Sequence, residues 1–167
     1  MNMKKRIFII TGYARSGKDT FCNILANYAR VFHVSIVDLA KRHARAMGWN
    51  GKKTEKSRRF ISDIKIAIDA FNDGSFQEVA RTVELFMRES THDILCIDMR
   101  ETKDICRAVK EWHAEVIQIE RKGVQQIISN VADAQAISYI GEKVIIPNHG
   151  TIEEFQETVK KFAETLD

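Results

Sequence analysis

The sequence predicts an α/β fold in which a parallel β-sheet is covered by helices on both faces. Short apolar runs rich in β-branched residues alternate with segments of helical periodicity along the 167 residues. A glycine-rich loop stands directly between the first apolar run and the first helical segment. Parallel neighbouring strands need crossover connections, and the helical segments supply them. One layered domain, residues 1–167, therefore fits the whole chain.

Five segments are predicted to be strands because they are short, apolar and bounded by charged or turn-forming residues. The first ends at a glycine, and the third ends at an acidic residue. The predicted strands are 5–11, 31–37, 94–98, 115–120 and 143–146. Ligands of parallel sheets bind at the carboxyl ends of the strands. We therefore expect the chemistry just after residues 11, 37, 98 and 120.

The segments between these strands carry apolar residues three or four positions apart, as amphipathic helices do. The predicted helices are 17–30, 38–47, 60–71, 76–87, 101–113 and a last helix from 151 onward. Asn72-Asp73-Gly74 ends one helix before the next begins. Thr151 and Glu154 have the spacing of a capping box at the start of the last helix. The apolar faces of 60–71 and 76–87 are also candidates for a homodimer interface.

Composition argues against several classes of protein. The three cysteines lack CxxC spacing and the five histidines are dispersed, so the pattern predicts neither a disulfide framework nor a zinc site. No apolar run approaches the roughly 20 residues that a membrane-spanning helix needs. Free thiols and the lack of a recognisable secretion signal favour the cytoplasm.

The first strand is followed by the segment GYARSGKDT, residues 12–20, which matches the GxxxxGK phosphate loop. Glycines let the backbone turn tightly, and the helix that follows presents free N–H groups to phosphate oxygens. A lysine at the seventh position reaches the β- and γ-phosphates as a point charge. The loop is predicted to bind a nucleoside triphosphate, with ATP as the first choice, through Gly12, Ala14, Arg15, Ser16, Gly17, Lys18, Asp19 and Thr20.

One position departs from the usual phosphate loop. The residue after the lysine is commonly a Ser or Thr that binds Mg²⁺, whereas here it is Asp19, with Thr20 next. A carboxylate there would hold magnesium directly or through water, or Thr20 would take the role. The third interpretation is an acid in the first turn of a helix, which the helix dipole favours. All three interpretations stay open.

A second polar cluster, Asp98-Met99-Arg100-Glu101, follows the third predicted strand. An acid at a strand end beside the phosphate loop commonly binds magnesium or its water shell. In an extended chain, Arg100 points to the same side as Asp98. Asp98 is therefore a candidate metal ligand together with Asp19. The alternative for Asp98 and Arg100 is a strand cap and a surface ion pair.

The net charge of +3 is unevenly distributed. Residues 41–65 contain nine Lys or Arg and two acids, a net charge of +7, so the rest of the chain carries −4. Such a block faces an anionic partner or forms a solvated helix face. Lys41, Arg58 and Arg59 are our candidates for binding an acceptor phosphate. No aromatic interleaving or nucleic-acid motif accompanies the charge, which disfavours nucleic acid as the partner.

Four segments together resemble one known family. They are the loop GYARSGKDT, the turn DMRE (98–101), the strand end IERKG (119–123) and the late segment IPNHGTIEEF (146–155). In this order they resemble the P-loop kinases of deoxynucleoside monophosphates, such as those encoded by bacteriophages. Animal-type phosphomevalonate kinases share the GKD variant of the loop. The resemblance covers nearly the whole chain, and the phosphate loop is its most specific part.

The resemblance implies a three-layer P-loop NTPase fold of the nucleoside monophosphate kinase type, with a five-stranded parallel sheet. By the same resemblance, Lys18 matches the triphosphate-binding lysine, and Asp98 with Arg100 match the pair that faces the acceptor. Arg121 matches an arginine near the lid. Acceptor-binding helices would span about 38–90 and a short lid about 121–141. This lid departs from the family pattern, because Lys122 is its only further Lys or Arg.

The resulting hypothesis is a kinase that moves the γ-phosphoryl group of MgATP to a nucleoside or deoxynucleoside monophosphate. Its catalytic residues would be Lys18, Asp98, Arg100 and Arg121, and its acceptor would bind to Lys41, Arg58, Arg59 and Arg100. A kinase of another small phosphorylated metabolite, such as phosphomevalonate, would share every motif. A nucleotide-binding regulatory module with degenerate catalysis is the third hypothesis, and the short lid and Asp19 motivate it.

Overall fold

The computed structural model describes residues 4–123 and 131–166, and it contains a five-stranded parallel sheet. The strands are β1 (Arg6–Thr11), β2 (Val31–Ser35), β3 (Ile94–Asp98), β4 (Glu115–Glu120) and β5 (Val144–Pro147). Their order in the sheet is β2-β3-β1-β4-β5, so β1 lies in the centre between β3 and β4. All five predicted strands are present, and every strand pair is parallel, as predicted.

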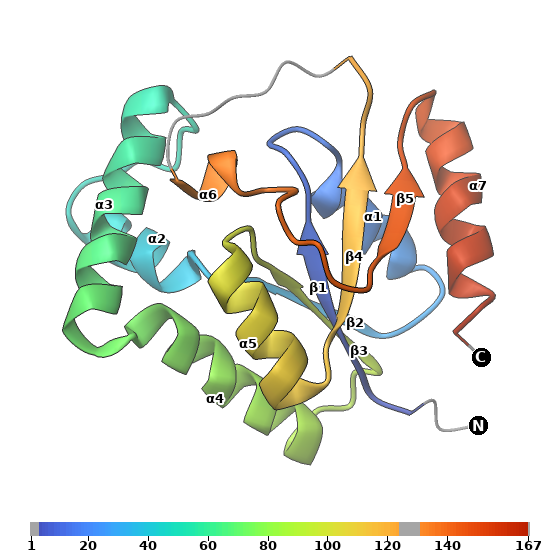
Figure 1. The fold of residues 1–167 in the computed structure, drawn as a ribbon, viewed down its shortest axis with the longest axis horizontal. Coiled ribbons are helices and arrows are strands. Elements are labelled where there is room, and N and C mark those ends of the chain that lie inside the picture. Colours follow the sequence, from blue (N-terminus) through green and yellow to red (C-terminus); the bar gives the residue numbers. More distant parts are fainter. Residues whose placement is uncertain (1–3, 124–130, 167) are drawn as a thin grey trace.

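Helices lie on both faces of this sheet, which makes a three-layer α/β structure (Figure 1). The helices are α1 (Lys18–Leu25), α2 (Asp38–Ala46), α3 (Glu55–Asn72), α4 (Gly74–Glu89), α5 (Thr102–Trp112), α6 (Val131–Ala134) and α7 (Ile152–Ala163). The capping box predicted for the last helix is present, because Thr151 and Glu154 exchange side-chain to backbone hydrogen bonds. No helix among the described residues is long and apolar enough to cross a membrane.

Two hydrophobic cores, one on each face, hold the layers together. Alternate residues of a strand point to opposite faces. Ile7 and Ile9 accordingly belong to the core shared with α4 and α5, whereas Phe8 and Ile10 belong to the core shared with α1 and α7. All four are buried. Each such side chain stabilises the fold by about 1.5–3 kcal/mol, which gives the central strand a fixed position under the phosphate loop.

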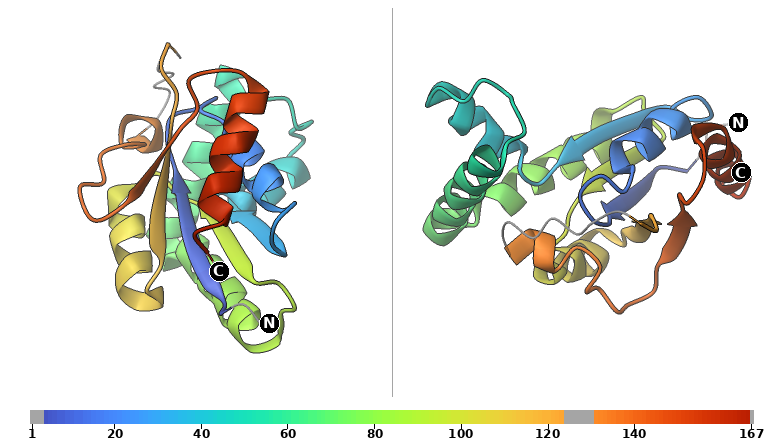
Figure 2. Two further views of the ribbon diagram at one scale, coloured as in Figure 1. Left: turned by 90° about the vertical axis from the view of Figure 1, so that its right-hand side faces the viewer. Right: turned by 90° about the horizontal axis from the view of Figure 1, so that it is seen from above.

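The carboxyl ends of the central strands meet at one edge of the sheet. Ile10 pairs with Asp98 of β3, and Thr11 pairs with Gln118 of β4. The loops that follow β1, β3 and β4 therefore start beside one another, where the chemistry was predicted. Helices α2 and α3 stand out from the layered body at one end of the molecule (Figure 2).

Two elements differ from the sequence-based prediction. The helix predicted over 17–30 ends at Leu25, and the N–H groups of Asn27 and Tyr28 donate to carbonyls only three residues back. These tighter turns let the chain reverse direction into β2. Helix α6 was not predicted, because a helix of four residues is too short to show an apolar period.

The polarity of α3 also differs from the prediction. Phe71, the last apolar residue of the predicted amphipathic helix 60–71, is 87% exposed, whereas Lys65 of the basic block is only 5% exposed. The ammonium of Lys65 lies 2.8 Å from Asp69, 2.9 Å from Glu101 and 3.5 Å from Asp104. Burial alone would lower the pKa of Lys65, but the hydrogen bonds and charges of these carboxylates outweigh it and raise the pKa. Lys65 therefore joins α3 to the start of α5 and does not face a ligand.

Candidate active site

The phosphate loop has a backbone that only glycine tolerates at two positions. Gly12 has φ +137°, and a Cβ there would lie 2.5 Å from the carbonyl oxygen of Ile119. Gly17 has φ +104°, and a Cβ there would lie 2.5 Å from the side-chain nitrogen of Asn148. Both conformations lie outside the range that L-residues usually adopt. Steric demand thus explains the two glycines of the motif.

The loop ends in the first turn of α1, whose N-terminus has no side-chain cap. Gly17 occupies the N-cap position in a left-handed conformation and has no side chain to accept the first N–H groups. Such groups carry the positive end of the helix dipole and bind anions well. Within the loop, Ala14 and Ser16 are buried and Arg15 is exposed, whereas Thr20 is half-buried on α1. This geometry is compatible with binding of phosphate oxygens, and the role of the loop stays a prediction.

Lys18 lies folded back on the loop. Its ammonium donates to the carbonyl oxygens of Gly12, at 2.9 Å, and Tyr13, at 2.8 Å. Burial, and next the positive charge of Arg100, lower the pKa of Lys18 to about 8, although nearby Asp98 and Asp19 oppose this. The structure thus brings Lys18, Arg100, Asp98 and Asp19 into one electrostatic neighbourhood. An anion bound there would offset the loss of hydration that Lys18 has undergone.

Asn148 is a residue of this site to which the sequence analysis gave no role. Its side-chain amide donates to the carbonyl oxygen of Ser16 at 2.8 Å, and its backbone N–H donates to Glu120 at 2.7 Å. Asn148 thereby ties the ends of β4 and β5 to the phosphate loop. The hydroxyl of Ser16 is buried and has no hydrogen-bond partner among the described residues. In the sequence, Asn148 is notable only because it belongs to the segment IPNHGT, which contributes to the family resemblance.

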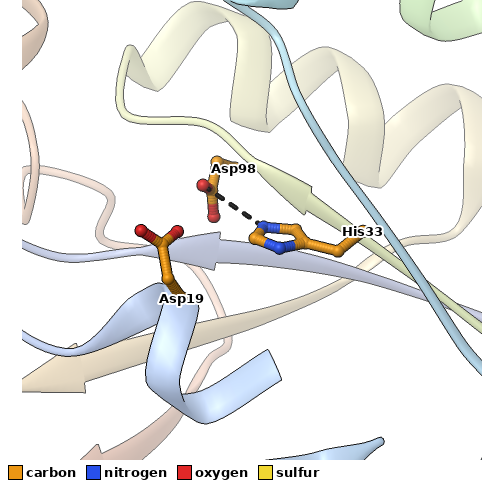
Figure 3. A group of neighbouring side chains, drawn as sticks. All are labelled: Asp19, His33 and Asp98. Atoms are coloured by element: carbon orange, nitrogen blue, oxygen red, sulfur yellow. Dashed lines mark ion pairs between the residues drawn. The ribbon is translucent and has the colours of Figure 1, made fainter. Parts of the chain in front are cut away.

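His33 is the second residue that the sequence analysis missed. In Figure 3 it faces Asp98 of β3 and Asp19 of α1, and one ligand atom of each residue lies within 4.8 Å of the others. Nε2 of His33 lies 3.3 Å from a carboxylate oxygen of Asp98. The contacts of His33 with Asp98 and then with Cys22 raise its pKa to about 10. A lone histidine in a strand carries no signal of this, because only the pairing of β2 with β3 brings it to Asp98.

Arg100 makes a contact that the sequence did not predict. Its guanidinium pairs with Asp133 of α6, whose side chain is almost fully buried. Neighbouring contacts hold this segment over the strand ends: the Thr11 hydroxyl donates to the carbonyl of Ala136, and the Thr102 N–H donates to the side-chain oxygen of Gln135. Residues 131–136 of the predicted lid therefore lie against the site. Residues 124–130 of that lid lie outside the described part of the chain.

The other predicted site residues form no hydrogen bond or ion pair with the phosphate loop in the part of the chain that the structure describes. Lys41 pairs with Asp38 at 2.9 Å, and Arg59 pairs with Glu55 of its own helix at 3.4 Å. Arg58 is half-buried and Arg121 is exposed. Within residues 4–123 and 131–166, none of these four forms a hydrogen bond or ion pair with the phosphate loop. The roles of Lys41, Arg58 and Arg59 toward an acceptor, and of Arg121 near the lid, therefore stay predictions.

Comparisons with known proteins found similar folds among solved structures only. No protein-family model matches the sequence, and no curated protein matches it. Among solved structures, a sugar kinase from Janibacter sp. HTCC2649 superposes with a TM-score of 0.57 at 9% identity, over 96% of this chain and 95% of that one. Shikimate kinase from Aquifex aeolicus gives 0.52 at 11% identity over 96% of each chain. A gluconokinase from Sinorhizobium meliloti 1021 gives 0.51 at 12% identity, over 99% and 97%.

These similarities extend over nearly the full length of each chain, and their low identities establish the fold alone. The protein has the α/β fold of the small P-loop kinases, with a five-stranded parallel sheet between helices. The predicted fold class is thereby confirmed. The kinases reported above act on a sugar, shikimate or gluconate by their descriptions. Their similarity gives no particular support to a nucleoside monophosphate as acceptor.

Proposed function

We propose that this protein is an ATP-dependent phosphotransferase that acts on a small anionic acceptor, with a nucleoside or deoxynucleoside monophosphate as the first candidate. One observation carries the proposal. The buried ammonium of Lys18 lies in a glycine loop at the uncapped start of α1, in the electrostatic range of Asp98 and Arg100. A triphosphate needs such donors around its oxygens, and an acceptor needs an acid and an arginine opposite them.

In this mechanism, the loop N–H groups and Lys18 would bind the β- and γ-phosphates and hold the γ-phosphorus in line with the acceptor. Asp19 and Asp98 would hold Mg²⁺, which neutralises phosphate charge when bound. The residues fit a cation, because Oδ1 of Asp98 is buried without a hydrogen-bond partner among the described residues. Thr20 stays the alternative to Asp19. Asp98 would also orient the attacking oxygen of the acceptor.

The acceptor would bind between the phosphate loop and the segment of about 38–90. Arg100 would contact the acceptor phosphate, with Lys41, Arg58 and Arg59 supplying further positive charge. Arg121 would close over ATP from the short lid of about 121–141. Arg100 would then have to share its guanidinium with Asp133 or leave it, because the two form an ion pair in this structure.

The deciding experiment measures ADP release with ATP, Mg²⁺ and a panel of acceptors. The panel contains the ribo- and deoxyribonucleoside monophosphates, phosphomevalonate, shikimate, gluconate and simple sugars. We expect turnover with at least one nucleoside monophosphate, and loss of at least about a hundredfold in kcat/KM for Lys18→Ala. Lys53→Ala, which removes an exposed lysine charge outside the phosphate loop, is the control and should retain activity. Turnover confined to a non-nucleotide acceptor would overturn the nucleotide assignment but keep the kinase.

A second candidate function is nucleotide binding without transfer. The pairing of Arg100 with the buried Asp133 favours it, because an arginine so engaged is not free for an acceptor. ATP binding measured by calorimetry, with no ADP formed beyond the acceptor-free background across the panel, is the result expected of such a regulatory module. Rapid turnover of any acceptor excludes it.

A further inference from the structure

Asp19, His33 and Asp98 come from three separate elements and converge beside the phosphate loop (Figure 3). Two carboxylates and one imidazole face a common point, and the cluster is half-buried at His33 and Asp98 and open to solvent at Asp19. A magnesium site would use oxygen ligands and has no need of the imidazole. We propose that these three residues bind a transition-metal dication, such as Mn²⁺, Co²⁺ or Zn²⁺, in preference to Mg²⁺.

The distances suit such an ion with a small adjustment. Metal bonds of about 2.1 Å place neighbouring ligand atoms about 3.0–3.4 Å apart. The 3.3 Å between Nε2 of His33 and the Asp98 carboxylate already has this spacing. The third ligand atom lies within 4.8 Å of the other two, and it belongs to an exposed side chain on the first turn of α1. A side-chain rotation of Asp19 would bring this atom toward the other two.

Unsatisfied polar atoms provide an independent reason to place a cation here. Oδ1 of Asp98 and Nε2 of His33 are both buried, and neither has an aligned hydrogen bond within the described part of the chain. Burying a polar atom without a partner costs free energy, and a carboxylate oxygen costs more than a neutral group. A bound dication would accept an electron pair from Nε2 of His33 and another from the Asp98 carboxylate. The contact between His33 and Asp98 in this structure is thus only a partial substitute for a metal.

The donor set decides which cations are preferred. Imidazole nitrogen binds Zn²⁺, Co²⁺ and similar ions well, whereas Mg²⁺ prefers oxygen and retains its water. A site with two carboxylates and one imidazole therefore follows the usual affinity order of the transition metals. In this structure, the contact between Nε2 of His33 and the Asp98 carboxylate occupies the position where the dication would bind.

This inference rests on the proposed function only in placing a cation beside the phosphate loop, and it replaces the Mg²⁺ assigned there to Asp19 and Asp98 by a transition metal that His33 also binds. Binding of the metal needs neither nucleotide nor turnover, so the test uses the nucleotide-free protein with any affinity tag removed. Co²⁺ alone is the probe, because nitrogen ligation changes its visible absorption and calorimetry gives its affinity. We expect one Co²⁺ per chain, and we expect Mg²⁺ to displace it only at an excess of at least about a hundredfold.

Substitutions test which side chains bind the Co²⁺ ion. His33→Asn should weaken Co²⁺ binding by at least about tenfold and change Mg²⁺ binding by less than about threefold. His43→Asn removes an exposed histidine of α2 and is the matched control, with unchanged Co²⁺ affinity expected. Asp19→Asn is the second variant, at an exposed position that tolerates substitution, and it should also weaken Co²⁺. Far-UV circular dichroism checks that each variant is folded.

The inference is overturned if Co²⁺ does not bind, if Mg²⁺ competes with it on equal terms, or if folded variants of His33 and Asp19 bind Co²⁺ like the parent protein. ATP binding and phosphoryl transfer are measured separately on the same preparation. A protein that binds Co²⁺ through His33 but transfers no phosphate would support the metal site and contradict the proposed function. Turnover with Mg²⁺ in a protein that binds no Co²⁺ would support the proposed function and contradict the transition-metal site.

Discussion

The side-chain amide of Asn148 donates a hydrogen bond of 2.8 Å to the carbonyl oxygen of Ser16, so the end of β5 is fastened to the phosphate loop. The same asparagine lies where a side chain on Gly17 would collide with it. The two residues of the hydrogen bond are 132 positions apart in the chain. The shape of the loop therefore depends on the C-terminal part of the sequence as well as on its own glycines.

Replacing this asparagine should loosen the loop. Asn148→Ala removes the bond and leaves the buried carbonyl of Ser16 unsatisfied, at a cost of about 1–2 kcal/mol in the free energy of unfolding. We expect ATP affinity to fall by about tenfold as well, since the loop is less well ordered. Urea unfolding and calorimetry measure the two effects. His149→Ala, which changes the exposed neighbour, is the control, and equal effects in both variants would contradict the assigned role.

Gly12 should not tolerate a side chain. Gly12→Ala places a Cβ against the carbonyl oxygen of Ile119 at a φ of +137°, and we expect a loss of about 3 kcal/mol or more with loss of ATP binding. Gly51→Ala separates the steric contact from the backbone strain, because Gly51 also has a positive φ, +87°, but has nothing within 4 Å of a Cβ. That control should lose only about 1 kcal/mol. Similar losses at both positions would show that the contact with Ile119 is unimportant.

Lys65 should be essential for stability. Lys65→Met leaves Asp69, Glu101 and Asp104 facing one another without the ammonium that neutralises them, which we expect to cost about 3–5 kcal/mol at neutral pH. Burial already raises the pKa of Asp104. Without Lys65 the carboxylates would be protonated more readily in the folded state, so the loss should shrink as the pH falls.

Urea unfolding of Lys65→Met at pH 7 and pH 5 measures this difference. Lys56→Met, at an exposed position of the same helix, is the matched control and should be close to neutral at both pH values. A Lys65 variant as stable as the control would mean that the ion-pair cluster contributes nothing net. A loss independent of pH would mean that packing of the lysine stem, and not its charge, is what matters.

Asp93 should make the protein sensitive to acid. Its carboxylate accepts hydrogen bonds from the backbone and guanidinium of Arg30, and these contacts lower the pKa of Asp93. A carboxyl with a depressed folded-state pKa stabilises the protein above its unfolded pKa near 4, and the stabilisation is lost as pH falls below that value. The melting temperature of Asp93→Asn should be lower than that of the parent at pH 7, and the gap should close toward pH 3.

A control for this prediction is Glu164→Gln, which removes an exposed carboxylate near the C-terminus. Its melting temperature should follow that of the parent across the same pH range. A gap between Asp93→Asn and the parent that widens toward low pH would contradict the assigned sign.

The sequence by itself determined the fold class and the phosphate loop, because both depend on local patterns. Strand and helix periods are visible in stretches of a few residues, and their alternation implies crossovers and a parallel sheet. Gly12, Gly17 and Lys18 lie within seven positions of one another, so their common role is visible at once. The strand ends also placed Asp98 and Arg100 at the edge where the structure has them.

Only the tertiary structure decided which side chains gather around that loop. Strand order is set by packing of distant segments, and the pairing of β2 with β3 brings His33 to Asp98. In the sequence, Lys65 is like the other cations of its block, and only the fold shows the three acids of α3 and the start of α5 around it. Asn148 is the last such case, since its partner Ser16 lies at the other end of the chain. Long-range contacts of this kind leave no period or spacing in one sequence.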